Sequence, residues 1–243
     1  MAIPAVTPEV PPGPQAMEST TVRCMRHGHR EFVLRWDERR TTAADVRRIV
    51  EAIEGDVARG VRFTPGAVVR VGWLPLRVVQ TPSRAFTLVE PDLSTLPPRW
   101  VRGVDTAIAH LRGQVDLAAR VGLADLLTHP SPEQTARVCS HAGGQGLVLD
   151  RRAPVGVDSG WFVGCGCEPG DDARLTTLHQ LVAQFPWIVD ALALPEGCTV
   201  ACTEAGDALV WRDGEPLGGR AGVSIATRLA RAPRPPLARC VGE

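Results

Sequence analysis

The sequence contains no lysine, no tyrosine and no asparagine, and aromatic residues make up only 5% of the chain. All 27 basic residues are therefore arginines. The missing residue types have AT-rich codons, so we attribute the bias to a GC-rich bacterial genome rather than to selection for guanidinium groups. The 27 acidic residues balance the arginines and leave a formal net charge of zero. This balance argues against a general nucleic-acid-binding protein, which normally carries an excess of basic residues.

Long apolar runs are also missing. No window approaches the roughly 18 consecutive apolar residues that a membrane-spanning helix needs. Residues 2–16 are rich in proline and have neither the basic start nor the apolar core of a secretory signal peptide. We therefore expect a cytoplasmic protein that does not bind membranes, with its seven cysteines reduced.

The 243 residues are enough for two small domains that each bury a core. We predict an α+β fold of two small domains, each a mostly antiparallel sheet with one or two packed helices. The composition predicts a disordered proline-rich tail, a first domain, a linker, a second domain and a proline- and arginine-rich tail. Their predicted ranges are 1–17, 18–121, 122–133, 134–216 and 217–243. Patterned sequence begins just after Met17, which makes this residue a candidate for the true start.

The first domain shows a β-β-α-β-β-β-α pattern. Its helix is predicted to begin after Thr42, because a hydroxyl at the N-cap and Asp45 in the first turn satisfy free N–H groups. Apolar residues from Val46 to Val57 repeat at helical spacing, and Gly60 supplies a stop. A second helix is expected with an apolar stripe from Val101 to Val115. The predicted strands are 20–26, 31–36, 67–73, 76–80 and 84–90.

The second domain is expected to contain further strands, one helix and a C-terminal hairpin. The helix is predicted over 174–184, with Leu175, Leu178, Leu181, Val182 and Phe185 on its buried face, and Pro186 interrupts it. The hairpin is expected to turn at residues 205–207. The predicted strands are 136–140, 146–150, the segment that starts at Asp158, 198–204 and 208–212.

Cysteine and histidine positions raise the question of a metal site. Cys165 and Cys167 could be joined by His179, Cys139 or His141. Zinc sites, however, usually use cysteine pairs separated by two to four residues, and no second pair has matching spacing. We predict no bound metal, no cofactor and no structural disulfide.

Catalytic arrangements are also conceivable. Cys165 or Ser159 beside a histidine would suit nucleophilic catalysis, but nothing resembles a nucleophile elbow or a phosphate-binding loop. Glu90 and Asp92 flank a proline and are better explained as a turn at the end of a strand. We therefore predict a protein without enzymatic activity. The alternative is a metal- or Cys/His-dependent enzyme acting on a small molecule.

The second half carries the motif "DSGWFVGCGCE", followed after a spacer by "LTTLHQLVAQFPWIVDALALPEGCTVACTEAGD". These segments resemble the bacterial immunity-protein family numbered thirty-three over about residues 134–213. Members are expected to be encoded beside polymorphic or contact-dependent toxins and to neutralise the cognate toxin by binding it. The resemblance therefore implies an immunity protein whose partner is a toxin. A non-catalytic adaptor or scaffold is the second alternative. Many members carry a more acidic and aromatic loop after the motif than the "GCGCEPGDD" found here.

On this interpretation, the motif separates into a structural part and a partner-binding part. Trp161 and its strand neighbour Val163 are expected to face the core, whereas Phe162 and the acidic residues face the partner. The acidic rim would oppose a basic toxin surface. The residues assigned to the motif's structure are Ser159, Gly160, Trp161 and Gly164. Those assigned to partner binding are Asp158, Phe162, Glu168, Asp171 and Asp172.

Overall fold

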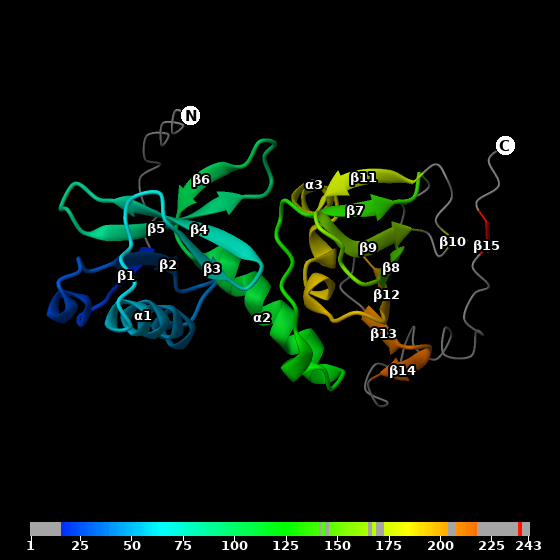
Figure 1. Ribbon diagram of the computed structural model, residues 1–243, viewed down its shortest axis with the longest axis horizontal. Coiled ribbons are helices and arrows are strands. Elements are labelled where there is room, and N and C mark those ends of the chain that lie inside the picture. The colour runs from blue at the N-terminus through cyan, green and yellow to red at the C-terminus, as the bar shows by residue number, and fades with distance from the viewer. Residues whose placement is uncertain are drawn as a thin grey trace. The chain divides into compact units, whose positions relative to one another are not determined.

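The computed structural model describes residues 16–140, 142–143, 146–164, 167–168, 173–203, 208–217 and 238–239. The chain divides into two compact units, Met1–Arg112 and Gly113–Glu243. Each unit has its own β-structure, and the sheets are mostly antiparallel, so the predicted α+β class is confirmed (Figure 1). The division falls inside helix α2 (Asp105–Arg120) rather than after it. Among the described residues, no helix is long and apolar enough to cross a membrane.

The first unit contains a two-stranded antiparallel pair, a four-stranded antiparallel sheet and two helices. Strand β1 (Ala16–Thr20) pairs with β2 (Val33–Asp37), so Ala16 and Met17 are part of the fold and not of the tail. Helices α1 and α2 lie below the four-stranded sheet in the view of Figure 1. The sheet has the order β3 (Val68–Val71), β4 (Leu74–Gln80), β5 (Phe86–Asp92), β6 (Arg99–Arg102).

Helix α1 (Ala43–Ala58) forms as its sequence predicts. The Thr42 hydroxyl accepts a hydrogen bond from the backbone N–H of Asp45 at 3.3 Å. The expected apolar stripe lies in the core except for Val50, which is half-buried, and Gly60 adopts a positive φ of 99° after the helix. This helix depends on local signals only, which is why its limits were predictable. The buried apolar side chains are Val46, Ile49, Ile53 and Val57.

Two elements predicted for the first unit differ in the structure. The expected strand over 20–26 is replaced by the 3₁₀ turn η1 (Cys24–His27). The second helix begins only at Asp105, and Val101 lies on β6 instead. Glu90 explains this start: its carboxylate accepts the backbone N–H groups of Thr106 at 3.0 Å and Ala107 at 2.9 Å, which satisfies the first turn of α2.

The second unit is built on a seven-stranded sheet in which only β7 and β9 pair in parallel. A separate short pair joins β10 (Cys167–Glu168) to β15 (Ala238–Arg239). The central sheet has the order β11 (Arg174–Thr177), β7 (Thr135–Val138), β9 (Asp158–Gly164), β8 (Gly146–Arg151), β12 (Cys198–Thr203), β13 (Ala208–Arg212), β14 (Glu215–Leu217). The helical elements are η2 (Ala124–Leu126), α3 (Leu178–Gln184), η3 (Pro186–Ile188) and η4 (Ala191–Ala193).

The helix predicted over 174–184 has seven residues instead of the expected eleven. Residues 174–177 form the edge strand β11, and Leu175 is 67% exposed rather than buried. Helix α3 begins after Thr177, whose hydroxyl and the Gln180 side chain form a reciprocal capping box. The C-terminal hairpin of β12 and β13 is confirmed, although its turn at 205–207 lies outside the described residues.

The first unit should lose stability in mild acid through His110. The Trp73 indole N–H donates to His110 Nδ1 at 3.2 Å, and burial lowers the pKa of His110 to about 4. This pKa lies below the pKa of His110 in the unfolded chain. The stabilisation of the fold by neutral His110 is therefore complete above pH 6.5 and is lost as the pH falls towards 4. We expect a loss of roughly 2 kcal/mol between pH 7 and 5, measured by urea unfolding. His110→Gln should reduce the slope over this range, and an unchanged slope would exclude His110 as its source.

Candidate functional site

The DSGW motif opens strand β9 with a tight turn. Val155 and Asp158 exchange two backbone hydrogen bonds, of 3.0 and 2.9 Å. The Asp158 carboxylate also accepts the backbone N–H of Gly160 at 2.8 Å and lies 3.5 Å from the Arg137 guanidinium. The side chain assigned to partner binding is thus half-buried and holds its own turn together.

Gly160 is the point of closest backbone approach in the motif. Its φ is +80°, and a Cβ there would lie 2.1 Å from the carbonyl oxygen of Arg152. The Arg152 N–H donates to the Gly160 carbonyl at 2.8 Å, which holds the two backbones together. Ser159 is fully buried, and its hydroxyl accepts the backbone N–H of Trp161 at 3.3 Å. Only glycine can occupy position 160 without displacing the neighbouring chain.

Trp161 lies in the core, with 1% of its surface exposed. Its indole N–H donates to the carbonyl oxygen of Leu192 at 3.1 Å, so the ring joins β9 to η4. The Arg151 guanidinium lies 5.1 Å from the ring centroid. These contacts give the indole both apolar packing and a partner for its one polar group.

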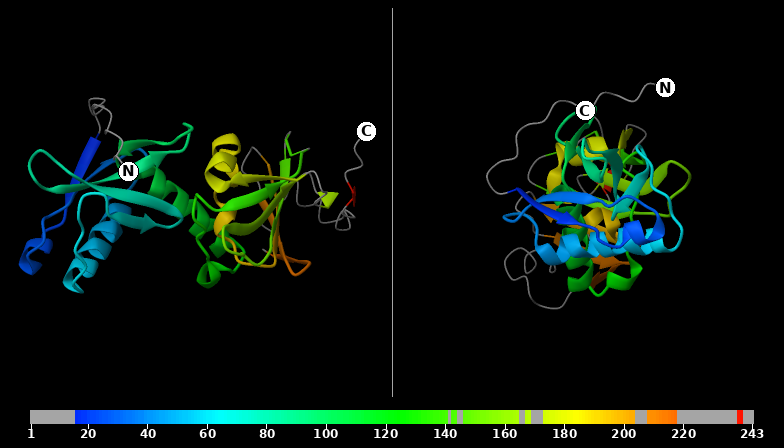
Figure 2. Two further views of the ribbon diagram at one scale, coloured as in Figure 1. Left: turned by 45° about the horizontal axis from the view of Figure 1, so that its top comes forward. Right: turned by 90° about the vertical axis from the view of Figure 1, so that its left-hand side faces the viewer.

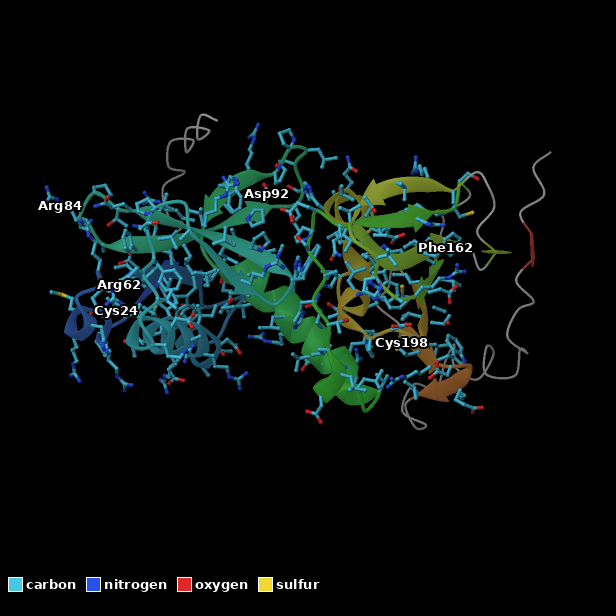
Figure 3. All side chains as sticks on the ribbon, viewed as in Figure 1. Cys24, Arg62, Arg84, Asp92, Phe162 and Cys198 are labelled. Carbon is cyan, nitrogen blue, oxygen red and sulfur yellow. The ribbon has the colours of Figure 1, made fainter. Side chains whose placement is uncertain are left out.

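Phe162 points to the opposite side of β9 from Trp161 but is only 3% exposed, contrary to the contact role predicted for it. It packs with Cys139, Ala142 and Ala173. A Cβ on Gly164 would lie 3.1 Å from the Phe162 ring. The space beside this glycine is therefore filled by Phe162, which agrees with the structural role assigned to Gly164. Figure 3 labels Phe162 on the second unit.

Sequence reasoning missed Arg151 as a feature of this region. The side chain is 6% exposed, and its Nε and Nη1 have no hydrogen-bond partner among the described residues. Burial lowers the pKa of Arg151 to about 10, although the nearby charges of Asp158 and Glu196 oppose the shift. The only sequence signal for its burial was the alternation of residues along β8. Arg151 pairs directly with Trp161 and therefore lies on the same buried face of the sheet.

The acidic segment after β9 cannot be placed in the same detail. Asp171 and Asp172 lie outside the described residues, and of Glu168 only the backbone, in β10, is described. The structure therefore brings together Asp158 and the structural residues of the motif. It leaves the acidic rim as a prediction.

The residues considered for catalysis or metal binding have structural contacts where they are described. Ser159 bonds to its own strand, Glu90 holds the start of α2, and Asp92 accepts the backbone N–H of Ser94 at 3.0 Å. Glu90 and Asp92 lie within β5 and not in a turn, which corrects the sequence interpretation. Burial raises the pKa of Glu90 despite the two N–H groups that it accepts. Within the described parts of the chain, no three His, Cys, Asp or Glu side chains group as metal ligands; Cys165 and His141 lie outside them.

Comparison with known families supports the resemblance found in the sequence. Residues 114–213 match the family model described as an Imm33-like domain. The match begins inside α2, at Gln114, a fully buried residue whose side-chain amide donates to the carbonyl of Val189 at 3.1 Å. It therefore includes a helical segment that the sequence placed in the first domain. No curated protein and no solved structure matches this chain.

The motif glycine, Gly160, should be far more sensitive to substitution than Gly156 in the turn that precedes β9. Gly160→Ala adds a methyl group that collides with the Arg152 carbonyl, and we expect a loss of at least about 3 kcal/mol in urea unfolding. Gly156→Ala is the matched control, because Gly156 also has a positive φ, of 59°, but no atom within 4 Å of a Cβ. It should cost about 1 kcal/mol. Equal losses in the two variants would contradict the close approach.

Proposed function

We propose that this chain is an immunity protein that binds and neutralises a cognate bacterial toxin, without catalysing a reaction. The observation that carries the proposal is the match of residues 114–213 to the Imm33-like family. Inhibition by binding requires a preformed surface of complementary shape and charge and no catalytic group. This requirement agrees with a motif whose described polar groups are engaged in holding the fold.

The charge of the second unit supports a basic partner. Gly113–Glu243 contains 11 arginines and 15 acidic residues, which gives a net charge of −4. Three of these acids, Glu168, Asp171 and Asp172, are clustered in the segment that follows β9. We propose that they form the rim that faces the toxin. A basic active site, such as that of a nuclease, is the surface that such a rim would cover best.

Strand β9 would then support the rim from within the fold. Trp161 fixes the strand to η4, and Phe162 fills the opposite side next to Gly164. Both side chains would act by holding the position from which the acidic segment starts, and neither would touch the toxin. Asp158 would contribute to the field of the rim while it holds the turn that begins the strand.

The proposal is tested with the toxin encoded beside this gene. Replacing Glu168, Asp171 and Asp172 together with Ala should slow association about tenfold at low salt and flatten its salt dependence, because exposed charges act mainly on the encounter. Melting should stay nearly unchanged, since exposed substitutions usually change stability by less than about 0.5 kcal/mol each.

The matched control removes three exposed acids elsewhere in the same unit, Asp125, Glu133 and Glu215, with the same change of charge. It should protect cells and bind nearly as the wild type does. If the rim variant also protects cells and binds as well as the wild type at every salt concentration, the contact surface lies elsewhere. If no variant and no wild-type protein binds the toxin, the proposed function is wrong.

A further inference from the structure

Residues 22–27 of the first unit, which we name the basic turn, present apolar side chains to solvent. Val22 is 71% exposed and Met25 is 72% exposed, and both are flanked by arginines. The turn contains η1 and connects β1 to β2; it projects from the edge of the unit in two views (Figures 1 and 2). No family match covers this part of the chain.

Two carboxylates fix the backbone of the basic turn. Glu54, on α1, accepts the N–H groups of Val22 at 2.7 Å and Arg23 at 3.1 Å. Glu31, just before β2, accepts those of Met25 at 2.9 Å and Cys24 at 3.3 Å. Four successive backbone donors are thus satisfied by side chains rather than by a neighbouring strand. Of the exposed side chains, Arg23 also pairs with Glu54, with its Nε 3.6 Å from the carboxylate, whereas no described contact of this kind involves Met25 or Val22.

Two further features stabilise the basic turn, the burial of Cys24 and the hydrogen bonds of Arg62. Cys24, which is part of the turn and is labelled in Figure 3, is fully buried. Arg62 donates to the carbonyl of His27 at 3.0 Å and also to that of Val57 at 3.4 Å, at the end of α1. The exposure of Val22 and Met25 is therefore a property of an ordered surface. Ordered apolar side chains bind at a low entropic cost, because their backbone is already fixed.

The charge around the basic turn is positive. The turn itself contributes Arg23 and Arg26, and Arg30 follows it; all three are exposed. The two acids that touch the turn accept backbone N–H groups, and Glu54 also lies 3.6 Å from the Arg23 guanidinium. Burial alone would raise the pKa of Glu31, but the hydrogen bonds from Thr21, Met25 and Cys24 outweigh it and lower the pKa. The first unit as a whole has 16 arginines against 12 acids, a net charge of +4, opposite to that of the second unit.

We propose that the basic turn is a second interaction surface, which docks onto an acidic surface of a protein partner with an apolar pocket for Met25. Arginine forms paired hydrogen bonds with carboxylates, so Arg23 and Arg26 suit aspartate and glutamate side chains beside that pocket. Methionine is flexible and polarizable, and it adapts to irregular pockets. This surface is separate from the one proposed for the toxin and does not depend on it.

An acidic protein suits the turn better than the other polyanions. Nucleic-acid binding usually draws on a larger basic excess and on many phosphate contacts, and the neutral chain supplies neither. Membrane binding uses a long apolar face, whereas the turn offers two apolar side chains. Both polyanions remain outcomes of the test.

The test uses the full-length chain and a synthetic 15-residue peptide of glutamate, leucine and phenylalanine, followed by fluorescence anisotropy. Met25→Ser with Arg26→Ser should weaken binding at least about tenfold, since an apolar anchor and a charge partner are both removed. The matched control, Val68→Ser with Arg70→Ser, removes an exposed valine and an arginine from β3 of the same unit. It should change the Kd less than about twofold.

A further variant separates the fixed backbone from the exposed side chains. Glu31→Gln with Glu54→Gln keeps Val22, Met25 and the arginines but weakens the hydrogen bonds that hold the backbone N–H groups of the turn. It should speed hydrogen exchange at Met25 and weaken peptide binding. The proposal is overturned if the peptide does not bind, or if the turn variant and the β3 control lose binding equally. It is also overturned if duplex DNA, anionic vesicles or a second copy of the chain, and not the peptide, bind in a manner that the turn variant abolishes.

Discussion

The approach of β9 to the backbone at Arg152 is the contact on which the second unit depends. It requires a residue without a Cβ at position 160, and it fixes where the strand begins and which way it faces. From that position the Trp161 indole donates to the Leu192 carbonyl, and the Asp158 carboxylate accepts the backbone N–H of Gly160. A four-residue motif thus carries a turn, a close contact and a core anchor. These three structural constraints act on four consecutive residues, which is why the motif is short.

Both units use carboxylates to satisfy backbone N–H groups. Glu90 does so at the start of α2, Glu31 and Glu54 do so in the basic turn, and Asp158 does so at β9. A buried carboxylate is costly unless such donors surround it, because its charge is removed from water. These acids therefore contribute to the fold through hydrogen bonds to the backbone.

The sequence predicted those elements whose signals are local. Helix α1 follows from its cap and its apolar spacing, and the hairpin of β12 and β13 follows from two alternating segments. The basic turn could not be predicted, because Glu54 lies about thirty residues away from the N–H groups that it accepts. Leu175 was misleading for a different reason. Its helical spacing from Leu178 imitates a buried face, whereas only the pairing of β11 with β7 shows that it lies on an edge strand.

The candidate site was predicted less well, because exposure cannot be deduced from residue type when a strand is covered on both sides. Phe162 was assigned to a contact face by alternation from Trp161, but the space beside Gly164 admits its own ring. The contacts that hold the fold also limit which side chains we propose for partner binding. Side chains that complete the hydrogen bonding of the fold cannot be released cheaply, so recognition falls to charges and apolar groups that the fold leaves unused. In the first unit the second interaction surface is proposed on the exposed Met25 and Arg26 of the basic turn, whereas Arg23 is also paired with Glu54. In the second unit the rim after β9 is proposed from the clustering of its acids in the sequence and from the net charge of the unit.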